Sequence, residues 1–158
     1  MDLNTLSVRG LIIVMLCISA INQSQAGEWF KDPETNCAVW SDYPQPIVTV
    51  YWSGDCVDGK ADGKGILKVL IDKIPFSSYE GEYKKGKAHG YGILITPDDS
   101  RYEGEFKNNR MHGHGVIKSI DGKRLEGNFI NGNPHGILKI TQPDGTIVEL
   151  EFDNGKRI

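Results

Sequence analysis

The clearest pattern in the sequence is an alternation of aromatic and charged residues that returns every 23 positions. It is complete in Tyr-Glu-Gly-Glu-Tyr at 79–83 and in Tyr-Glu-Gly-Glu-Phe at 102–106. Weaker copies are Leu-Glu-Gly-Asn-Phe at 125–129 and Val-Glu-Leu-Glu-Phe at 148–152. Because alternate side chains of a strand share a face, each copy predicts a strand with apolar rings on one side and charges on the other. A fixed period of this length predicts a repeat architecture.

Each copy continues into a turn and then into an apolar return strand. The signature His-Gly-x-Gly recurs at 89–92 and 112–115 and weakens to His-Gly-Ile-Leu at 135–138. The β-branched run that follows, as at 92–95, favours a strand. Turn-forming sequences then separate the copies, at 97–100, 121–123 and 143–145. The predicted fold class is therefore all-β: an elongated single-layer antiparallel sheet of β-hairpin repeats with an N-terminal cap that does not repeat.

The period also predicts how the chain is divided. The segments are a signal peptide at 1–26, a cap at 27–49 and repeats at 50–158, with a degenerate repeat at 50–78, full repeats at 79–101, 102–124 and 125–147, and a half repeat at 148–158. In the degenerate repeat, Trp52 to Cys56 align with Tyr79 to Tyr83, and Gly81 follows Gly54 by 27 positions. We expect the four extra residues between 72 and 78.

Spacing and residue type together resemble the MORN (membrane occupation and recognition nexus) repeat, over roughly residues 50–158. The copy at 102–124 departs from that pattern at Asn109, where the turn glycine usually stands. The copy at 125–147 departs at Leu125 and Leu138. The resemblance implies a protein-interaction scaffold and, for some members, phospholipid binding.

Residues 1–26 have the features of a secretory signal peptide. Arg9 precedes an apolar stretch at 11–21, which is shorter than the roughly 20 residues that span a bilayer, and Ser-Gln-Ala at 24–26 fits a cleavage site. The mature protein is then exported, to the periplasm or outside the cell. The alternative is an uncleaved membrane anchor at 11–21. A lipoprotein signal at Cys17 is disfavoured because Leu16 stands where a small residue is needed.

Two cysteines, Cys37 and Cys56, remain after cleavage. In an oxidising compartment they predict a disulfide, which would join the cap to the aromatic face near the first repeat. The alternative is a pair of free buried thiols. Neither cysteine has a neighbouring histidine or a CxxC spacing, which disfavours catalysis or metal binding.

Charge and residue spacing narrow the function classes. The formal net charge of −3 disfavours nucleic acid as a partner. It also disfavours association with a phospholipid membrane surface, which is the alternative function. His89, His112 and His135 recur two strands apart, about 10 Å, which is too far for a shared metal unless their side chains lean together. His112 and His114 leave weak chelation as an alternative. We predict no metal site and no cofactor.

Seven glutamates recur on the polar face, and two readings of them are open. By alternation they form a solvated charged face, which predicts a protein that is not an enzyme. The rival reading is a carboxylate-dependent hydrolase acting on an envelope polymer. The glutamates are Glu80, Glu82, Glu103, Glu105, Glu126, Glu149 and Glu151.

The opposite, aromatic face is the predicted binding site, for a protein partner or a second copy of the chain. Its residues are Trp52, Tyr79, Tyr83, Tyr102, Phe106, Leu125, Phe129 and Phe152. The cap is too short to cover the last repeats, so we expect an exposed strip there, centred on Tyr102, Phe106, Phe129 and Phe152. The alternative is that the rings and the glycine backbone cover one another.

Overall fold

The computed structural model describes residues 27–42 and 48–158, and every regular element in these ranges is a β-strand. The predicted all-β class is confirmed. No helix that could cross a membrane occurs in these ranges, and the predicted signal peptide lies outside them. The strands are β1 (Glu28–Lys31), β2 (Ala38–Ser41), β3 (Val48–Trp52), β4 (Asp55–Val57), β5 (Lys60–Ile71), β6 (Ile74–Lys84), β7 (Lys87–Ile95), β8 (Arg101–Lys107), β9 (Arg110–Lys118), β10 (Arg124–Ile130), β11 (Asn133–Thr141), β12 (Ile147–Asp153) and β13 (Lys156–Arg157).

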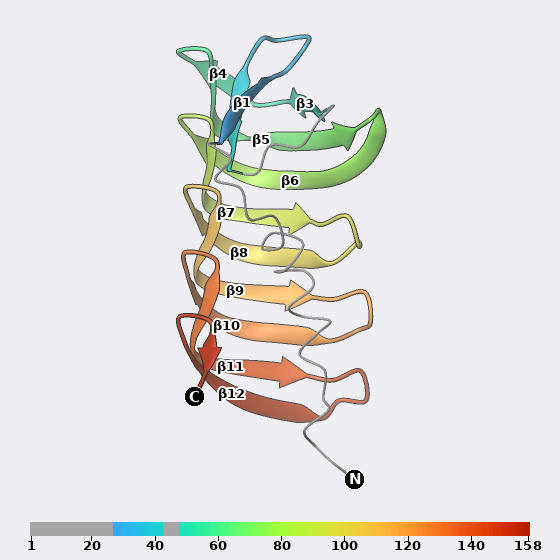
Figure 1. Ribbon diagram of the computed structural model, residues 1–158, viewed down its shortest axis with the longest axis vertical. Helices are drawn as coiled ribbons and strands as arrows, with labels where there is room; N and C mark the ends of the chain where they lie inside the picture. Colours follow the sequence, from blue (N-terminus) through green and yellow to red (C-terminus); the bar gives the residue numbers. More distant parts are fainter. Residues whose placement is uncertain (1–26, 43–47) are drawn as a thin grey trace.

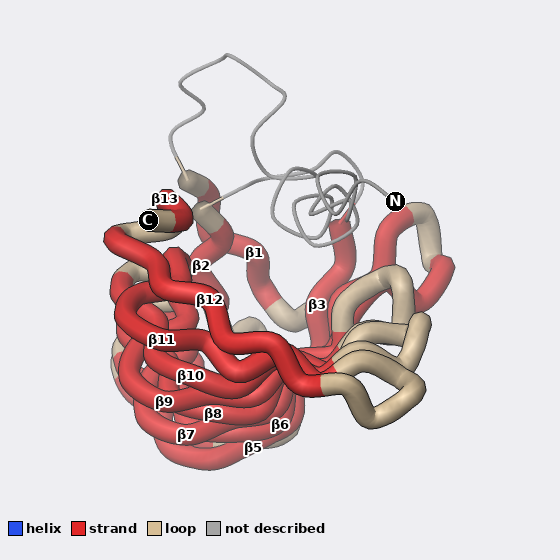
Figure 2. Tube along the Cα trace, turned by 90° about the horizontal axis from the view of Figure 1, so that it is seen from below, coloured by secondary structure: helices blue, strands red, loops and turns tan. Residues whose placement is uncertain are grey.

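From β5 onward each strand pairs with the next in the antiparallel sense, so that hairpins stack along one long axis (Figure 1). Strands β3 and β4 pair with β5, and β2 joins the start of β5 in parallel. Viewed along the long axis, the strands curve into a trough, and the β1–β2 hairpin of the cap lies on its concave side (Figure 2). The sheet is one layer thick and open.

The central glycines form a ladder across the sheet, and tyrosine rings lie on it. A Cβ atom placed on Gly81 would come within 2.7 Å of the Tyr79 hydroxyl oxygen, which shows how closely the ring approaches the backbone. That hydroxyl group donates a hydrogen bond to the Glu82 carbonyl at 3.1 Å. Tyr102 lies over Gly104 in the same way. The paired glycines are, in order, Gly65, Gly81, Gly92, Gly104, Gly115 and Gly127.

The His-Gly signature marks a bulge in each hairpin. Gly81 faces Gly92, but the next residue, Glu82, faces His89, so two residues of β7 have no partner in β6. Gly90, the first of them, has a φ of 61°, a conformation that glycine adopts without strain. Gly113 and Gly136 are also in the left-handed region. The bulge explains why this glycine recurs in each signature.

Ring contacts connect one repeat to the next, and all of them are edge-to-face except that of Trp52 with Tyr83, whose planes are tilted by 50°. Ring centroids are 4.7 Å apart for Trp52 and Tyr83, 5.3 Å for Tyr83 and Tyr79, and 5.0 Å for Tyr79 and Phe106. The series continues from Phe106 through Tyr102 to Phe129, at 5.0 and 5.6 Å. Such pairs contribute about 0.5–1.5 kcal/mol each beyond the area that they bury.

The third full repeat, residues 125–147, replaces both partners of the ring-on-glycine contact. Leu125 stands in place of the tyrosine, and Leu138 stands in place of the glycine that the ring would cover. Both leucines are almost completely buried, and Leu138 Cδ1 lies 3.0 Å from the position of a Cβ on Gly127. The Leu138 side chain therefore fills the space that a tyrosine ring fills in the preceding repeats.

The first repeat follows the same register as the later ones. Trp52 faces Leu67, which faces Tyr79, and Cys56 faces Ala61 as Tyr83 faces Ala88. The four extra residues lengthen the β5–β6 hairpin at its tip, residues 70–76. The tip overlaps the segment where we expected them.

A disulfide and a buried carboxylate join the cap to the first repeat. The predicted Cys37–Cys56 bond is present, with its Cα atoms 5.8 Å apart. Asp32, which is also buried, accepts a hydrogen bond from the Trp52 N–H at 2.7 Å. Burial alone would raise the pKa of Asp32, but hydrogen bonds from backbone N–H groups, that of Trp52 first, hold the pKa below its ordinary value.

We predict that Leu125 and Leu138 are energetically coupled. Leu138→Gly alone should destabilise the protein by about 3–5 kcal/mol through the cavity it leaves. Leu125→Tyr alone should cost about 1–3 kcal/mol because the ring meets the Leu138 side chain. In the double variant the ring occupies the vacated space, so urea unfolding should give a coupling of about 1–3 kcal/mol in favour of the pair. Additive effects of the two substitutions would contradict this packing.

Candidate functional site

The structure brings the predicted aromatic residues together on the concave side. The buried cluster contains the cap residues Cys37 and Val39 together with the aromatic residues, so the cap packs against the aromatic face. The aromatic members of the cluster are Trp52, Tyr79, Tyr83, Tyr102, Phe106 and Phe129. Phe152, on β12, is only partly buried.

The predicted exposed strip is wrong for the last repeats. Tyr102 is 3% exposed, Phe106 5% and Phe129 1%, although the cap has its main contacts with β3, β5 and β7. The rings are buried because each tyrosine lies flat on glycine backbone and each neighbour covers it edge-on. The alternative, in which the rings and glycines cover one another, describes this face. These residues form the core of the sheet.

An aliphatic row runs beside the rings on the same face and remains more accessible. Leu94 faces Tyr102, Ile117 faces Leu125, and Ile140 faces Val148 across adjacent strands. Leu94, Ile117 and Ile140 are half-buried, whereas Val148, on β12, is 39% exposed. This row was not among the predicted binding residues, because the recurring aromatic residues are the stronger signal in the sequence. Alternation alone places the row on the aromatic face.

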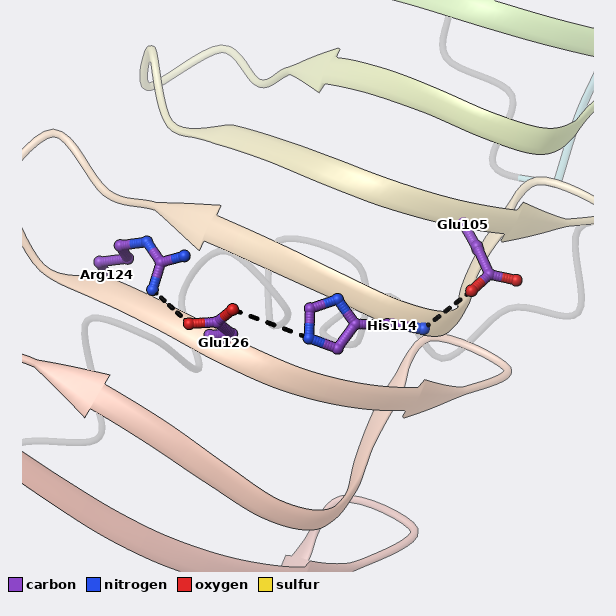
Figure 3. Close-up of polar contacts among 4 residues, drawn as sticks. All are labelled: Glu105, His114, Arg124 and Glu126. Atoms are coloured by element: carbon purple, nitrogen blue, oxygen red, sulfur yellow. Dashed lines mark hydrogen bonds and ion pairs between the residues drawn. The ribbon is translucent and has the colours of Figure 1, made fainter.

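The convex side carries the glutamates, and several of them are paired with cations or hydroxyl groups. Figure 3 shows Arg124 beside Glu126 and Glu126 beside the His114 ring, with 3.8 Å between Glu126 Oε1 and His114 Nε2. The backbone N–H of His114 donates a hydrogen bond to the Glu105 carboxylate at 3.2 Å. The Arg124 guanidinium holds the pKa of the Glu126 carboxyl below its ordinary value. Figure 3 therefore shows a charge-paired surface.

The preceding repeat has an equivalent network on the convex side. Arg101 lies 2.7 Å from Glu103, and the Tyr91 hydroxyl group donates to the same carboxylate at 2.8 Å. The Arg101 bond first, and then the Tyr91 bond, hold the pKa of Glu103 below its ordinary value. A general acid requires the opposite shift.

The histidines lie on the strands that follow the turns. His135 Nδ1 is 3.6 Å from an oxygen of Asp153, and His114 contacts Glu126. Across residues 27–42 and 48–158 there is no group of three or more His, Cys, Asp or Glu side chains that could hold a metal ion.

The hairpin turns stack along one side of the trough and form what we call the turn edge, residues 58–59, 85–86, 108–109, 131–132 and 154–155. In each turn from the second onward, the second residue donates its N–H to a carbonyl of the preceding repeat, at 2.8–3.0 Å. The donors are Gly86, Asn109, Gly132 and Gly155, and the acceptors are Ala61, Ala88, Met111 and Pro134. This column of bonds joins the repeats independently of the rings.

The MORN repeat family model matches residues 79–101, 102–124 and 126–147. The chain contains three MORN repeats. No curated protein matches its sequence significantly. The three matched MORN repeats contain most of the aromatic residues of the buried cluster. The degenerate first repeat continues the same register outside the match.

One departure from the MORN pattern has a structural reason. Asn109 replaces the turn glycine and has a φ of 68°, which asparagine tolerates. Its side-chain oxygen accepts a hydrogen bond from the Ala88 N–H at 2.7 Å, and its side-chain nitrogen donates to the Trp40 carbonyl at 3.0 Å. A glycine would lose both bonds, so Asn109 connects the second MORN repeat to the cap.

We predict that Phe106→Ser acts on stability. Removing this buried ring should lower the free energy of unfolding by about 3–5 kcal/mol, because it leaves a cavity beside Tyr79 and Tyr102. Phe76→Ser makes the same chemical change at a side chain that is 41% exposed on the β5–β6 tip and should cost less than about 1 kcal/mol. Chemical denaturation of the two variants measures the difference. Equal, small effects would contradict a core role for Phe106.

Proposed function

We propose that this MORN repeat protein is an exported, non-catalytic module that binds a protein partner on its concave side. The observation that carries the proposal is the aliphatic row Leu94, Ile117, Ile140 and Val148. It extends over successive hairpins beyond β5, and the main contacts of the cap do not reach β9, β11 or β12. A half-buried apolar row on a single-layer sheet is a surface that a partner can cover with gain of free energy.

The two sides of the sheet differ in what they offer a partner. The convex side presents paired charges, whose desolvation on binding opposes association. The concave side presents methyl groups supported by a rigid row of rings, which loses little side-chain entropy when a partner binds. The concave side is therefore the better docking surface.

The pKa directions favour a binding module over the rival hydrolase. A hydrolytic carboxylate pair needs one carboxyl group whose pKa is raised. Among residues 27–42 and 48–158, the carboxyl groups with a shifted pKa all shift downward, namely Asp32, Asp98, Glu103, Asp121, Glu126 and Asp144. Each accepts hydrogen bonds that favour its charged form.

Export is supported by the disulfide. The Cys37–Cys56 bond is typical of an oxidising compartment, and residues 1–26 have the composition of a cleaved signal.

We expect the protein recovered from its native cell envelope or medium to begin at Gly27 and to be two hydrogens lighter than its reduced form. Intact-mass measurement before and after reduction checks both points. A chain that retains residues 11–21 would support the anchored alternative. Two thiols that alkylate freely in non-reducing denaturant would contradict the bridge in the exported protein.

The concave docking surface predicts face-specific crosslinking. A photo-reactive phenylalanine analogue at Ile140 should crosslink to a partner in the native envelope fraction. The same analogue at Ile137 is the matched control, because Ile137 lies on the same strand but faces Glu151 on the convex side. Circular dichroism should show that both variants retain the fold. Equal yields at the two positions, or crosslinks from position 137 alone, would refute the concave site.

A further inference from the structure

The cap shows how the turn edge binds an extended chain. Strand β2 crosses the turns and donates backbone hydrogen bonds to their carbonyl groups at every second residue. The Ala38 N–H donates to Gly59 at 2.9 Å, and the Trp40 N–H donates to Gly86 at 2.8 Å. The Lys87 ammonium group lies 5.0 Å from the centroid of the Trp40 ring. The turn edge is thus already a strand-binding surface within this molecule.

The same edge continues beyond the end of β2 at Ser41. The turns at 131–132 and 154–155 are joined to the preceding repeats by the bonds that also hold Gly86 in place. The carbonyl groups of Gly132 and Gly155 are equivalent to that of Gly86. No donor in the described ranges reaches either of them. Acceptors of the type that β2 uses are therefore available further along.

Cationic side chains that form no ion pair lie close together where β2 ends. A pocket of about 300 Å³ there is lined by Asp42, Lys87, Lys107, Asn108, Arg110 and Asn131. Within the described ranges Lys107 and Arg110 form no ion pair, in contrast to Arg101, Lys123 and Arg124. The Asp42 carboxylate accepts a hydrogen bond from the Trp40 indole at 2.8 Å. The pocket thus concentrates cations in a chain whose net charge is −3.

We propose that the turn edge beyond β2 binds an extended acidic segment of a partner protein. The backbone N–H groups of the segment donate to turn carbonyls, as those of β2 do, and its carboxylates pair with Lys107 and Arg110. This inference rests on the proposed function as a protein-binding module and adds a second contact surface to the concave side. Backbone addition to an exposed edge is a general mode of peptide recognition.

The shape and charge of the edge favour a peptide over a membrane surface. Turn carbonyls require donors, which a peptide backbone supplies and a phosphodiester group lacks. The convex side next to the edge carries Glu82 and Glu105, which repel a broad anionic surface but leave room for a single strand. A linear acidic chain satisfies both conditions.

The test uses the complete mature protein and a fluorescent peptide of four Thr-Glu repeats, in which alternation places every glutamate on one face. Fluorescence anisotropy in 50 mM salt should show saturable binding. Lys107→Glu with Arg110→Glu should weaken binding at least tenfold. The matched control, Lys118→Glu with Lys139→Glu, makes the same charge change on the convex side of β9 and β11 and should alter affinity less than twofold. Two further peptides, one N-methylated at every Thr and one at every Glu, keep the charge but each lose one of the two alternating sets of donors, and the one that loses the set facing the turns should bind at least tenfold more weakly.

Several results would overturn the inference. Absence of saturable binding, unchanged affinity for both N-methylated peptides, or equal loss in the control variant would each do so. Vesicles of phosphatidylglycerol that bind through Lys107 and Arg110, without binding of the peptide, would assign the edge to lipid instead. Crosslinking at Ile140 tests the concave side and is independent of the turn edge. If it persists while the peptide fails to bind, only this inference fails and the concave site stands.

Discussion

The contact on which the fold depends is the tyrosine ring that lies flat on paired glycines. An open sheet one layer thick has no second layer to exclude water from its apolar side. Placing Tyr79 over Gly81 and Gly92 lets the ring cover the backbone of two strands at once, and the hydroxyl group keeps a partner at the Glu82 carbonyl. Burial raises the pKa of Tyr79, so the neutral hydroxyl that makes this bond persists through the physiological range.

This contact makes the molecule a series of nearest-neighbour interfaces. Phe106 touches the tyrosine of its own repeat and that of the preceding repeat, so it joins Tyr79 to Tyr102, and Phe129 touches Tyr102 of the repeat before it. The column of backbone bonds at the turn edge joins the same neighbours a second time, through atoms of the turns. Stability in such an array grows with the number of interfaces. The cap closes the first interface covalently, through Cys56.

The sequence predicted the period, the faces and the disulfide because each depends on local spacing or on compartment chemistry. It did not predict that Tyr102 and Phe106 would be buried, because alternation gives the side of a strand and not the tilt of a ring. The path of β2 across the turns was also out of reach, since the cap has no repeat from which to infer a register. Asn109 was the one local sign in the sequence of a contact between the cap and the turns. It broke the pattern at the turn that contacts Trp40, and its reason became visible only with the cap in place.

Repetition separates what folding requires from what it does not. The bond between turns uses backbone atoms, so the fold does not require a cation at the residue that follows each turn. That residue is nevertheless Lys60, Lys87 and Arg110 in three successive repeats. The first two lie over cap rings, Lys60 near Trp29 and Lys87 near Trp40, at 4.9 and 5.0 Å. Arg110 holds the equivalent place where β2 has ended, without a ring above it in the described residues. Because this cation recurs at Arg110, beyond the rings of the cap, it supports a further binding surface on the turn edge after the end of β2.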